Sequence, residues 1–317
     1  MKEINILFLG GAKRVSLAEH FIASGKKMGY RVNIFSYELQ KECPIAAVGK
    51  VIVGKRWKDD SLAENVMDTV RGNNIHIMLP FVDPAVEIAA WEKDILSEVF
   101  IPVSNEDICS IMFDKKKSEQ WFLYNNFPIP YSYKSTDEFN FPIIIKPRRG
   151  SASKGVEVIH TREEWKNVEN PNDYVIQHYI ADKAEYTVDC YVSQRGEIIS
   201  VVPRERLLVA GGEVINYRTI HDRKLDELSR KILKAGNFRG PITIQFIRDN
   251  QTGESFVMEI NPRLGGGVIA SIEAGADIPT YILNEYLGNE VKPCTDWKAD
   301  TLMTRYYKEV MFYADNH

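Results

Sequence analysis

A ten-residue segment, Met258 to Gly267, constrains the fold more than any other feature of the chain. It reads Met-Glu-Ile-Asn-Pro-Arg-Leu-Gly-Gly-Gly, so an acid, an amide and a guanidinium occupy alternate positions. Because successive side chains of a strand point to opposite faces, Glu259, Asn261 and Arg263 are expected to share one face. Carboxylate and amide oxygens bind Mg²⁺, and arginine pairs with phosphoryl oxygens, so the segment predicts a magnesium and phosphate site. A solvated polar strand face is the competing interpretation.

A second segment, residues 141–156, predicts a loop that contacts phosphates. An apolar strand ends on Lys146 and is followed by small residues between Gly150 and Gly155. Such a loop can turn backbone N–H groups toward phosphate oxygens, while the lysine supplies a mobile charge. The segment lacks the Gly-Lys-Ser/Thr ending of a Walker A loop, and residues 10–14 lack the three spaced glycines of a dinucleotide fingerprint.

Strand and helix patterns alternate from the start of the chain, which predicts an α/β fold. The first lobe is expected to be a parallel sheet, with strands at 4–9, 31–37 and 75–80 and helices at 15–28 and 61–71. A central lobe is expected to contain a helix at 115–125 and strands near 143 and 175. The last lobe is expected to contain strands at 186–192, 198–202, 242–248 and 256–260. Gly253 marks a hairpin that would bring Gln245 beside Glu259.

Composition argues against several classes of function. The 317 residues include 40 basic and 44 acidic side chains without a long basic run, so no nucleic-acid partner is expected. No apolar run reaches membrane-spanning length, and the first ten residues do not resemble a signal peptide, so we expect a cytoplasmic protein without membrane contact. The four cysteines lack a Cys-x-x-Cys pair, which argues against a zinc site or a disulfide framework.

Six motifs in a fixed order resemble those of the ATP-grasp superfamily, in the branch similar to the large subunit of carbamoyl phosphate synthase. They are Asp114-Lys115, Pro-Ile-Ile-Ile-Lys-Pro at 142–147 with its glycine loop, Val-Ile-Gln-His-Tyr-Ile at 175–180, Glu-Tyr-Thr-Val-Asp at 185–189, Gln245-Phe246 and Glu-Ile-Asn-Pro-Arg at 259–263. The resemblance covers nearly the whole chain. It implies a Rossmann-like N-terminal domain at 1–110, a small α+β lid at 111–180 and a C-terminal α+β part at 181–317, with ATP between the last two.

The resemblance also implies how ATP and a metal would be bound. The residues that match nucleotide contacts of the family are Lys115, Lys146, Ser151, Ser153, Gly155, Gln177, His178, Tyr179, Ile180 and Glu185. The residues that match its magnesium ligands are Gln245, Glu259 and Asn261, and Mn²⁺ is the metal that can replace Mg²⁺. Arg263, together with Lys146 and Asn261, would serve the phosphoryl transfer. The family usually has glutamate where this chain has His178, which leaves the adenine contact and the choice of nucleotide open.

The acceptor substrates have less distinct candidates. These are arginines and glycines near the predicted strand ends: Arg204, Arg206, Arg218, Gly265, Gly266 and Arg305. Arginine can orient a carboxylate or a developing acyl phosphate, and surface ion pairs are the alternative interpretation. The turn at 10–14 also has two interpretations: it could bind an anion, or it could be a structural turn without a ligand. Asp83 and Glu87 could face the site, or could serve only in capping and solvation.

Together these features predict an ATP- and Mg²⁺-dependent carboxylate–amine ligase. A carboxylate would be phosphorylated to an acyl phosphate, an amine would attack it, and ADP and phosphate would leave. A kinase whose product keeps the phosphate, and a nucleotide-binding regulatory protein without turnover, are the alternatives. The sequence does not identify the carboxylate or the amine, and it shows no duplicated half that would support carbamoyl phosphate synthesis. A homodimer through the N-terminal or central lobe is the default expectation for assembly.

Overall fold

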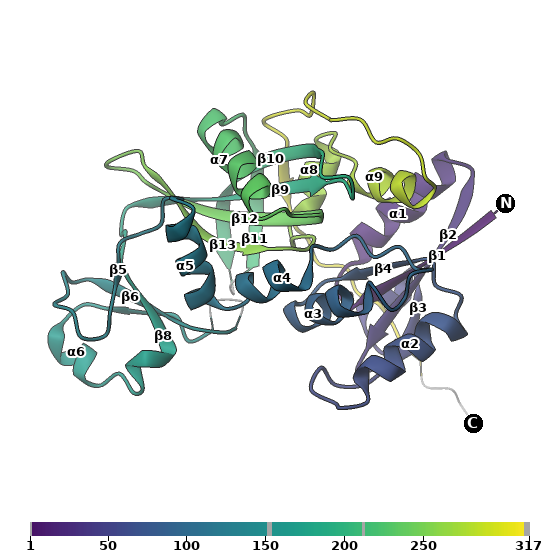
Figure 1. Cartoon of the computed structure of the whole chain (residues 1–317). Helices are drawn as coiled ribbons and strands as arrows, with labels where there is room; N and C mark the ends of the chain where they lie inside the picture. Colours follow the sequence, from purple (N-terminus) through teal and green to yellow (C-terminus); the bar gives the residue numbers. More distant parts are fainter. Residues whose placement is uncertain (1, 151–153, 211–212, 314–317) are drawn as a thin grey trace.

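Three β-sheets divide the molecule into an N-terminal, a central and a C-terminal lobe (Figure 1). The computed structural model describes residues 2–150, 154–210 and 213–313. The three-part α/β architecture predicted from the sequence is confirmed. The boundaries placed at 110 and 180 stay predictions.

The N-terminal lobe is a four-stranded parallel sheet in the order β3-β2-β1-β4, covered by helices on both faces (Figure 1). In β1, Ile6 and Phe8 enter one apolar cluster while Leu7 and Leu9 enter another, which explains the unbroken apolar run of this strand. The elements are β1 (Lys2–Leu9), α1 (Val15–Lys27), β2 (Tyr30–Glu38), η1 (Pro44–Ala47), β3 (Lys50–Val53), α2 (Leu62–Gly72), β4 (Ile77–Pro80), α3 (Asp83–Glu92) and α4 (Glu106–Met112).

The central lobe is a small antiparallel sheet in the order β5-β8-β6-β7. Its core is a cluster of four buried isoleucines, Ile143, Ile145, Ile159 and Ile176, with aromatic side chains around them. Few apolar groups support this lobe, so its position depends on contacts with the larger lobes. Its elements are α5 (Lys115–Tyr124), β5 (Ser132–Tyr133), β6 (Ile143–Pro147), β7 (Glu157–Ile159), α6 (Arg162–Lys166), η2 (Pro171–Asp173) and β8 (Tyr174–His178).

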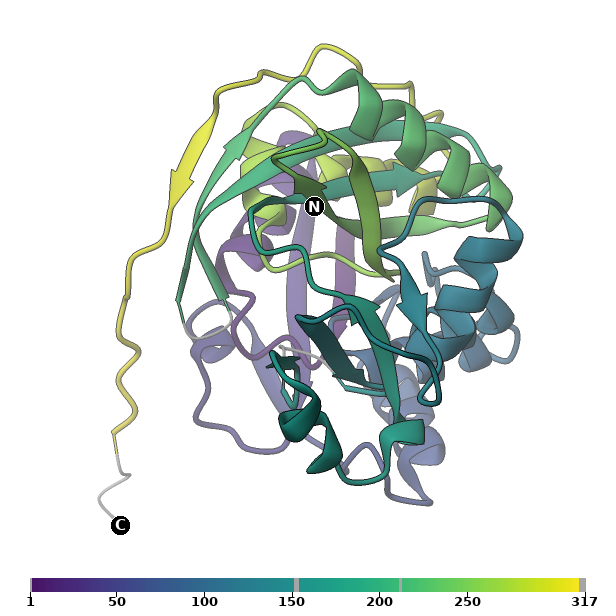
Figure 2. The same ribbon diagram turned by 90° about the vertical axis from the view of Figure 1, so that its left-hand side faces the viewer.

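The C-terminal lobe is a six-stranded sheet in the order β13-β12-β9-β10-β11-β14, over which α7 lies (Figure 1, Figure 2). One face is apolar: Val188, Ile244 and Phe246 pack there against Leu225 and Ile232 of α7. The other face carries the polar residues described below. The elements are β9 (Lys183–Val192), β10 (Ile198–Ala210), β11 (Glu213–Thr219), α7 (Arg223–Ala235), β12 (Gly240–Asp249), β13 (Ser255–Asn261), α8 (Val268–Glu273), α9 (Ile278–Tyr286) and β14 (Leu302–Thr304).

Two further sequence expectations can be compared with the structure. Within the described ranges no helix combines the length and the apolar character that a membrane crossing requires. The four cysteines are free thiols; Cys43, Cys109 and Cys190 are buried and Cys294 is partly exposed.

Glu92, the last residue of α3, is an unusual member of the N-terminal core. Its side chain is 0% exposed, and neither carboxylate oxygen has a hydrogen-bond partner among the described residues. Burial raises the pKa of Glu92 to about 7, because the ionised form is separated from water without compensation. The lobe is therefore destabilised when this carboxyl loses its proton.

We predict that Glu92→Gln removes a pH dependence from folding stability. The wild-type carboxyl contributes no penalty below the unfolded pKa of 4.5; the penalty grows between that value and the folded pKa of about 7, and is constant above it. The shift corresponds to about 3 kcal/mol, so at pH 8 the variant should be more stable by roughly 3 kcal/mol and at about pH 4 nearly equal to wild type. Denaturant unfolding at both pH values measures this. Glu98→Gln, an exposed neighbour, should change neither value.

Candidate active site

Polar side chains from four adjacent strands gather on one face of the six-stranded sheet. The strand register places Glu259, Gln245, Thr187 and Arg204 in one row across β13, β12, β9 and β10. A second row holds Asn261, Thr243 and Asp189. Residues opposite each other in antiparallel strands share a face, so the two rows form a continuous polar surface opposite the face that packs on α7.

The three predicted magnesium ligands lie together at one edge of this surface. The Gln245 Nε2 atom donates to Glu259 Oε1 at 2.5 Å, and Asn261 Nδ2 donates to the same oxygen at 2.9 Å. Gln245 and Glu259 are direct partners across the β12–β13 hairpin, as the Gly253 turn predicts. The sequence therefore located these three neighbours correctly in space, while their role as ligands stays a prediction.

The donor set fits a single hard cation. One carboxylate and two amide groups offer oxygen ligands of the kind that Mg²⁺ prefers, once each amide turns its oxygen toward the ion. In the structure without metal, Gln245 and Asn261 turn their amide N–H groups toward Glu259. The oxygen and nitrogen of an amide can exchange places by rotation of the group, so both oxygens could face a cation instead. The described residues contain no cluster of three or more His, Cys, Asp or Glu side chains suited to a metal. Because Glu259 is the one charged group among the three proposed ligands, a divalent cation held by them would retain positive charge for phosphate oxygens.

Arg263 connects this site to the N-terminal lobe. Its guanidinium donates to Asn261 Oδ1 at 3.0 Å and to Asp83 Oδ1 at 3.2 Å through both Nε and Nη2. Asp83 is the first residue of α3, and its contact with Arg263 means that it faces the C-terminal lobe. This agrees with the interpretation that Asp83 faces the site. Glu87, one turn later, is partly exposed, and its Oε1 atom lies 4.0 Å from Arg149 Nη1.

Lys146 of the central lobe lies next to the strand that carries the three predicted magnesium ligands. Its Nζ atom lies 2.9 Å from Gln177 Oε1 and 4.0 Å from Met258 Sδ, next to Glu259 in β13. Burial lowers the pKa of Lys146 to about 8, an effect that the nearby Glu259 carboxylate opposes and the Lys115 ammonium reinforces. A partly desolvated lysine beside an acidic residue is suited to receive an anionic phosphate group.

Lys115 begins α5 and points to the glycine loop. Its Nζ atom donates to the Gly150 carbonyl at 2.7 Å, and Asp114 caps the helix by accepting from the N–H groups of Lys116 and Lys117. Burial raises the pKa of Asp114, but hydrogen bonds from the Lys117 N–H and Arg148 outweigh it and leave the pKa lowered. The predicted contacts Ser151 and Ser153 lie outside the described residues. Gly155 has φ +70°, which favours glycine.

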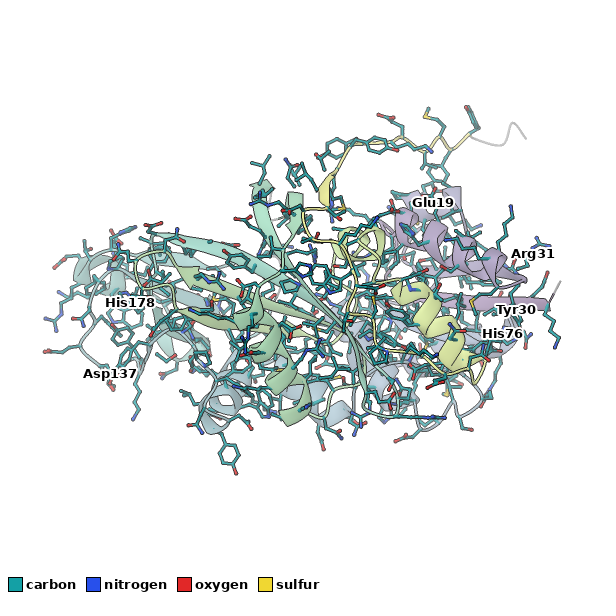
Figure 3. All side chains as sticks on the ribbon, turned by 90° about the horizontal axis from the view of Figure 1, so that it is seen from above. Glu19, Tyr30, Arg31, His76, Asp137 and His178 are labelled. Carbon is teal, nitrogen blue, oxygen red and sulfur yellow. The ribbon has the colours of Figure 1, made fainter. Side chains whose placement is uncertain are left out.

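The segment that joins the central and C-terminal lobes contains the predicted base and ribose contacts. Gln177 is buried and accepts from Lys146, whereas His178 is exposed at the end of β8, far from the N-terminal lobe (Figure 3). After Tyr179 and Ile180, the carboxylate of Glu185 pairs with Arg206 at 3.0 Å. His178 thus has the exposure needed to meet a ligand, and its contact with adenine stays a prediction.

The three candidate arginines of the hairpin β10–β11 differ in their positions. Arg206 lies between two predicted ligand residues, because its Nη1 atom is 3.0 Å from Glu185 and 3.2 Å from Gln245 Oε1. Arg218 lies on the opposite face and pairs with Glu205 at 2.5 Å. A surface ion pair, the alternative considered from the sequence, describes Arg218, so its assignment as a substrate contact needs correction.

Arg204 also needs correction, since its side chain is only 1% exposed and cannot reach a substrate on the surface. Its Nε and Nη2 atoms form a bidentate pair with Asp189 at 2.7 and 3.0 Å, and Ser271 donates to the same carboxylate at 2.6 Å. The guanidinium stacks on Tyr217, with 4.3 Å between its carbon and the ring centroid. Sequence reasoning missed Asp189, Tyr217 and Ser271 as partners, because only the fold brings them together.

The glycine loop at 265–267 is held by arginines from distant parts of the chain. Arg14 Nη1 donates to the Gly265 carbonyl at 3.3 Å, and Arg305 Nη2 donates to the Gly266 carbonyl at 2.5 Å. Gly265 and Gly266, predicted as substrate contacts, thus lie beside two guanidinium groups. Arg305 directly follows β14, and its contact with a substrate stays a prediction.

The turn at 10–14 has a structural explanation. The carboxylate of Glu38 in β2 accepts hydrogen bonds from the N–H groups of Gly11 and Ala12 and from Ser36 Oγ at 2.6 Å. Burial raises the pKa of Glu38, and these three bonds counteract the rise. Because an internal carboxylate already occupies the donors, the structural interpretation of this turn is favoured over an anion contact.

Comparison with known proteins places this arrangement in a class. Residues 170–309 match the family described as "ATP-grasp in the biosynthetic pathway with Ter operon". A D-alanine–D-alanine ligase of Rickettsia typhi is 26% identical over 201 residues, which cover 54% of this chain and 60% of that enzyme. The match thus spans less than two thirds of this relative.

Solved structures agree on the fold. The biotin carboxylase domain of Hydrogenobacter thermophilus 2-oxoglutarate carboxylase, a complex with MgADP and bicarbonate, aligns with a TM-score of 0.75 and 15% identity, covering 93% of this chain and 72% of that one. An L-amino acid ligase from Bacillus licheniformis aligns with a TM-score of 0.69 and 15% identity, covering 92% and 78%.

The solved structures show the ATP-grasp fold, and residues 170–309 carry the match to an ATP-grasp family. The chain belongs to the ATP-grasp superfamily. Its place in the branch similar to carbamoyl phosphate synthase stays a prediction.

We predict that Gly267→Ala disturbs the glycine loop and the protein's stability together. An added Cβ would lie 2.4 Å from Arg204 Nη1 and 2.5 Å from the Tyr217 ring, and neither buried group can move away. Overpacking of this kind costs about 1–3 kcal/mol, measurable by denaturant unfolding. Gly72→Ala is the matched control, since nothing lies within 4 Å of its added Cβ. Equal stability of the two variants would contradict the packing described here.

Proposed function

We propose that this protein is an ATP- and Mg²⁺-dependent ligase that activates a carboxylate as an acyl phosphate for attack by an amine, with release of ADP and phosphate. The observation that carries the proposal is the meeting of Lys146 from the central lobe with the Glu259 strand of the C-terminal lobe. A phosphate-binding cation and a metal-binding carboxylate are both needed at the γ-phosphoryl group. Here Lys146 and Glu259 would supply them from two separate lobes.

The chain's own residues would act mainly by binding and alignment. Lys146 and Lys115 would hold phosphate oxygens, and Glu185 would accept from the ribose. Arg263, fixed by Asp83 and Asn261, would steady the transferred phosphoryl group. A magnesium ion held by Gln245, Glu259 and Asn261 would supply neutralising charge to the phosphates.

The acceptor carboxylate would lie between Arg263 and the glycine loop at 265–267. Two guanidinium groups, of Arg14 and Arg305, surround that loop and bring positive charge to this end of the surface. Such a charge distribution favours an organic acid over a neutral alcohol as the acceptor. The names of the relatives, a D-alanine–D-alanine ligase and an L-amino acid ligase, favour amino acids as the first acids to test.

A screen of carboxylates paired with amines, read by ADP release and by mass spectrometry of the products, tests the proposal. An amide product together with free phosphate is the expected outcome. A stable phosphorylated acid without amide would instead indicate the kinase alternative. Absence of nucleotide binding at millimolar ATP and magnesium would remove the basis of the proposal altogether.

We predict that Glu259→Gln lowers carboxylate-dependent ADP formation by about a hundredfold or more, the usual loss when a charge that serves the transition state is removed. The replacement keeps the size of the side chain and its place beside Gln245, so circular dichroism should be unchanged. Glu254→Gln, an exposed position in the same hairpin, is the control and should retain activity. Normal turnover of a folded Glu259→Gln protein would contradict the metal assignment.

We predict that ATP affinity falls as the pH rises above about 8. Burial lowers the pKa of Lys146 to about 8, so its ammonium is present at pH 7 and largely lost at pH 9. Since bound phosphate would stabilise the charged form, affinity should decrease about tenfold between pH 7 and pH 9. Calorimetry with a non-hydrolysable ATP analogue measures this. Lys146→Met should bind more weakly and without this dependence; a parallel pH dependence in both proteins would exclude Lys146 as its source.

A further inference from the structure

Gln245, one of the proposed metal ligands, makes two hydrogen bonds that together fix which way its amide faces. Its Oε1 atom accepts from Arg206 Nη1 at 3.2 Å, and its Nε2 atom donates to Glu259 Oε1 at 2.5 Å. A guanidinium can only donate, and an ionised carboxylate can only accept. The opposite orientation would set donor against donor and acceptor against acceptor, so the two neighbours select one orientation of this amide.

The selected orientation is unsuited to a metal ion. A cation held by Glu259 needs the amide oxygen of Gln245 on its own side, whereas the structure directs that oxygen to Arg206. Asn261 follows the same pattern, because its Nδ2 atom donates to Glu259 and its Oδ1 atom accepts from Arg263. Each amide of the proposed ligand set therefore turns its oxygen to an arginine and its N–H groups to the carboxylate.

Arg206 reaches Gln245 across an intervening strand. It lies on β10 and Gln245 on β12, and β9 runs between these two strands in the sheet. On β9 the partner of Arg206 is Glu185, whose Oε2 atom lies 3.0 Å from the same Nη1 atom. The Nε atom of Arg206 is buried and has no hydrogen-bond partner among the described residues. A buried donor without an acceptor is unfavourable, so this arrangement would give way to a ligand with better acceptors.

The two arginines that face the amides differ in how they are held. Arg263 donates through both Nε and Nη2 to Asp83 of the N-terminal lobe. Arg206 depends instead on Glu185, which is the proposed ribose contact and whose side chain is 39% exposed. A ligand that engages Glu185 thus competes directly for the group that holds Arg206 in place.

We propose that Arg206 is a positioning residue that keeps Gln245 turned away from the metal until the ribose of a nucleotide engages Glu185. The carboxylate of Glu185 then accepts from the ribose hydroxyls, Arg206 turns to phosphate oxygens, and the amide oxygen of Gln245 becomes free to face the cation. The inference rests on the proposed function for the roles of Glu185 and Gln245. Nucleotide and metal then strengthen each other's binding by the same factor.

Binding of Mn²⁺ to the full chain without nucleotide, measured by electron paramagnetic resonance of the free ion, tests the first part. Arg206→Met should bind Mn²⁺ about tenfold more tightly than wild type, because the Gln245 amide can turn and no guanidinium faces the cation. A gain in affinity is not what damage to the fold would produce. Arg218→Met is the matched control: it removes an arginine from the opposite face of the same hairpin and should bind Mn²⁺ like wild type.

Adenosine tests the second part, because it has the ribose hydroxyls of ATP but no phosphate that could itself bind the ion. In wild type, saturating adenosine should raise the Mn²⁺ affinity about tenfold, within the roughly 5–150-fold range of couplings between sites. In Arg206→Met it should cause no further rise. Dideoxyadenosine, which lacks both ribose hydroxyls, should have no effect on either protein.

The inference is overturned if Arg206→Met binds Mn²⁺ no more tightly than wild type, or if Arg218→Met shows the same gain. It is also overturned if adenosine leaves the Mn²⁺ affinity of wild type unchanged, or if dideoxyadenosine raises that affinity equally. Any of these results in a protein that still binds MgATP would leave the proposed function intact. A wild type that binds no MgATP at millimolar concentration would contradict the proposed function itself.

Discussion

The buried ion pair between Arg204 and Asp189 is the interaction on which the arrangement of the site depends. Two charges taken out of water are costly unless their geometry is satisfied, and here two parallel hydrogen bonds, the Ser271 hydroxyl and the Tyr217 ring surround them. The guanidinium lies so close to Gly267 that no larger residue fits there. Strands β9 and β10, α8 and the glycine loop are thereby fixed relative to one another, which gives the polar face its shape.

Patterns within one strand allowed much of this face to be predicted. The alternation of Glu259, Asn261 and Arg263 and the hairpin turn at Gly253 are local features, and local geometry alone brings Gln245 to Glu259. The parallel sheet of the first lobe could also be predicted from the sequence. Its central strand β1 is buried on both faces and is therefore an unbroken run of apolar residues. In both cases the physical rule spans only a few residues.

Register between distant strands could not be predicted. Arg218 resembles Arg204 and Arg206 in the sequence, yet its pairing with Glu205 across β10 and β11 places it on the opposite face from both. Strand β10 extends to Ala210, well beyond the predicted end at 202, and the sequence did not indicate β11. The place of Glu38 under the turn at 10–14 similarly depends on neighbouring parallel strands, so a choice between anion site and structural turn required the fold.

The contact of Asp83 with Arg263 has a consequence for how such enzymes diversify. The guanidinium next to the strand of Glu259 and Asn261 is oriented in part by Asp83 in the first turn of α3, in a lobe that contributes none of the proposed nucleotide ligands. Recombination that exchanged the first lobe for that of a relative would leave all proposed phosphate-binding side chains in place and still deprive this arginine of its carboxylate partner. Modular inheritance of the lobes is therefore restricted to donors that carry an acid at this helix start.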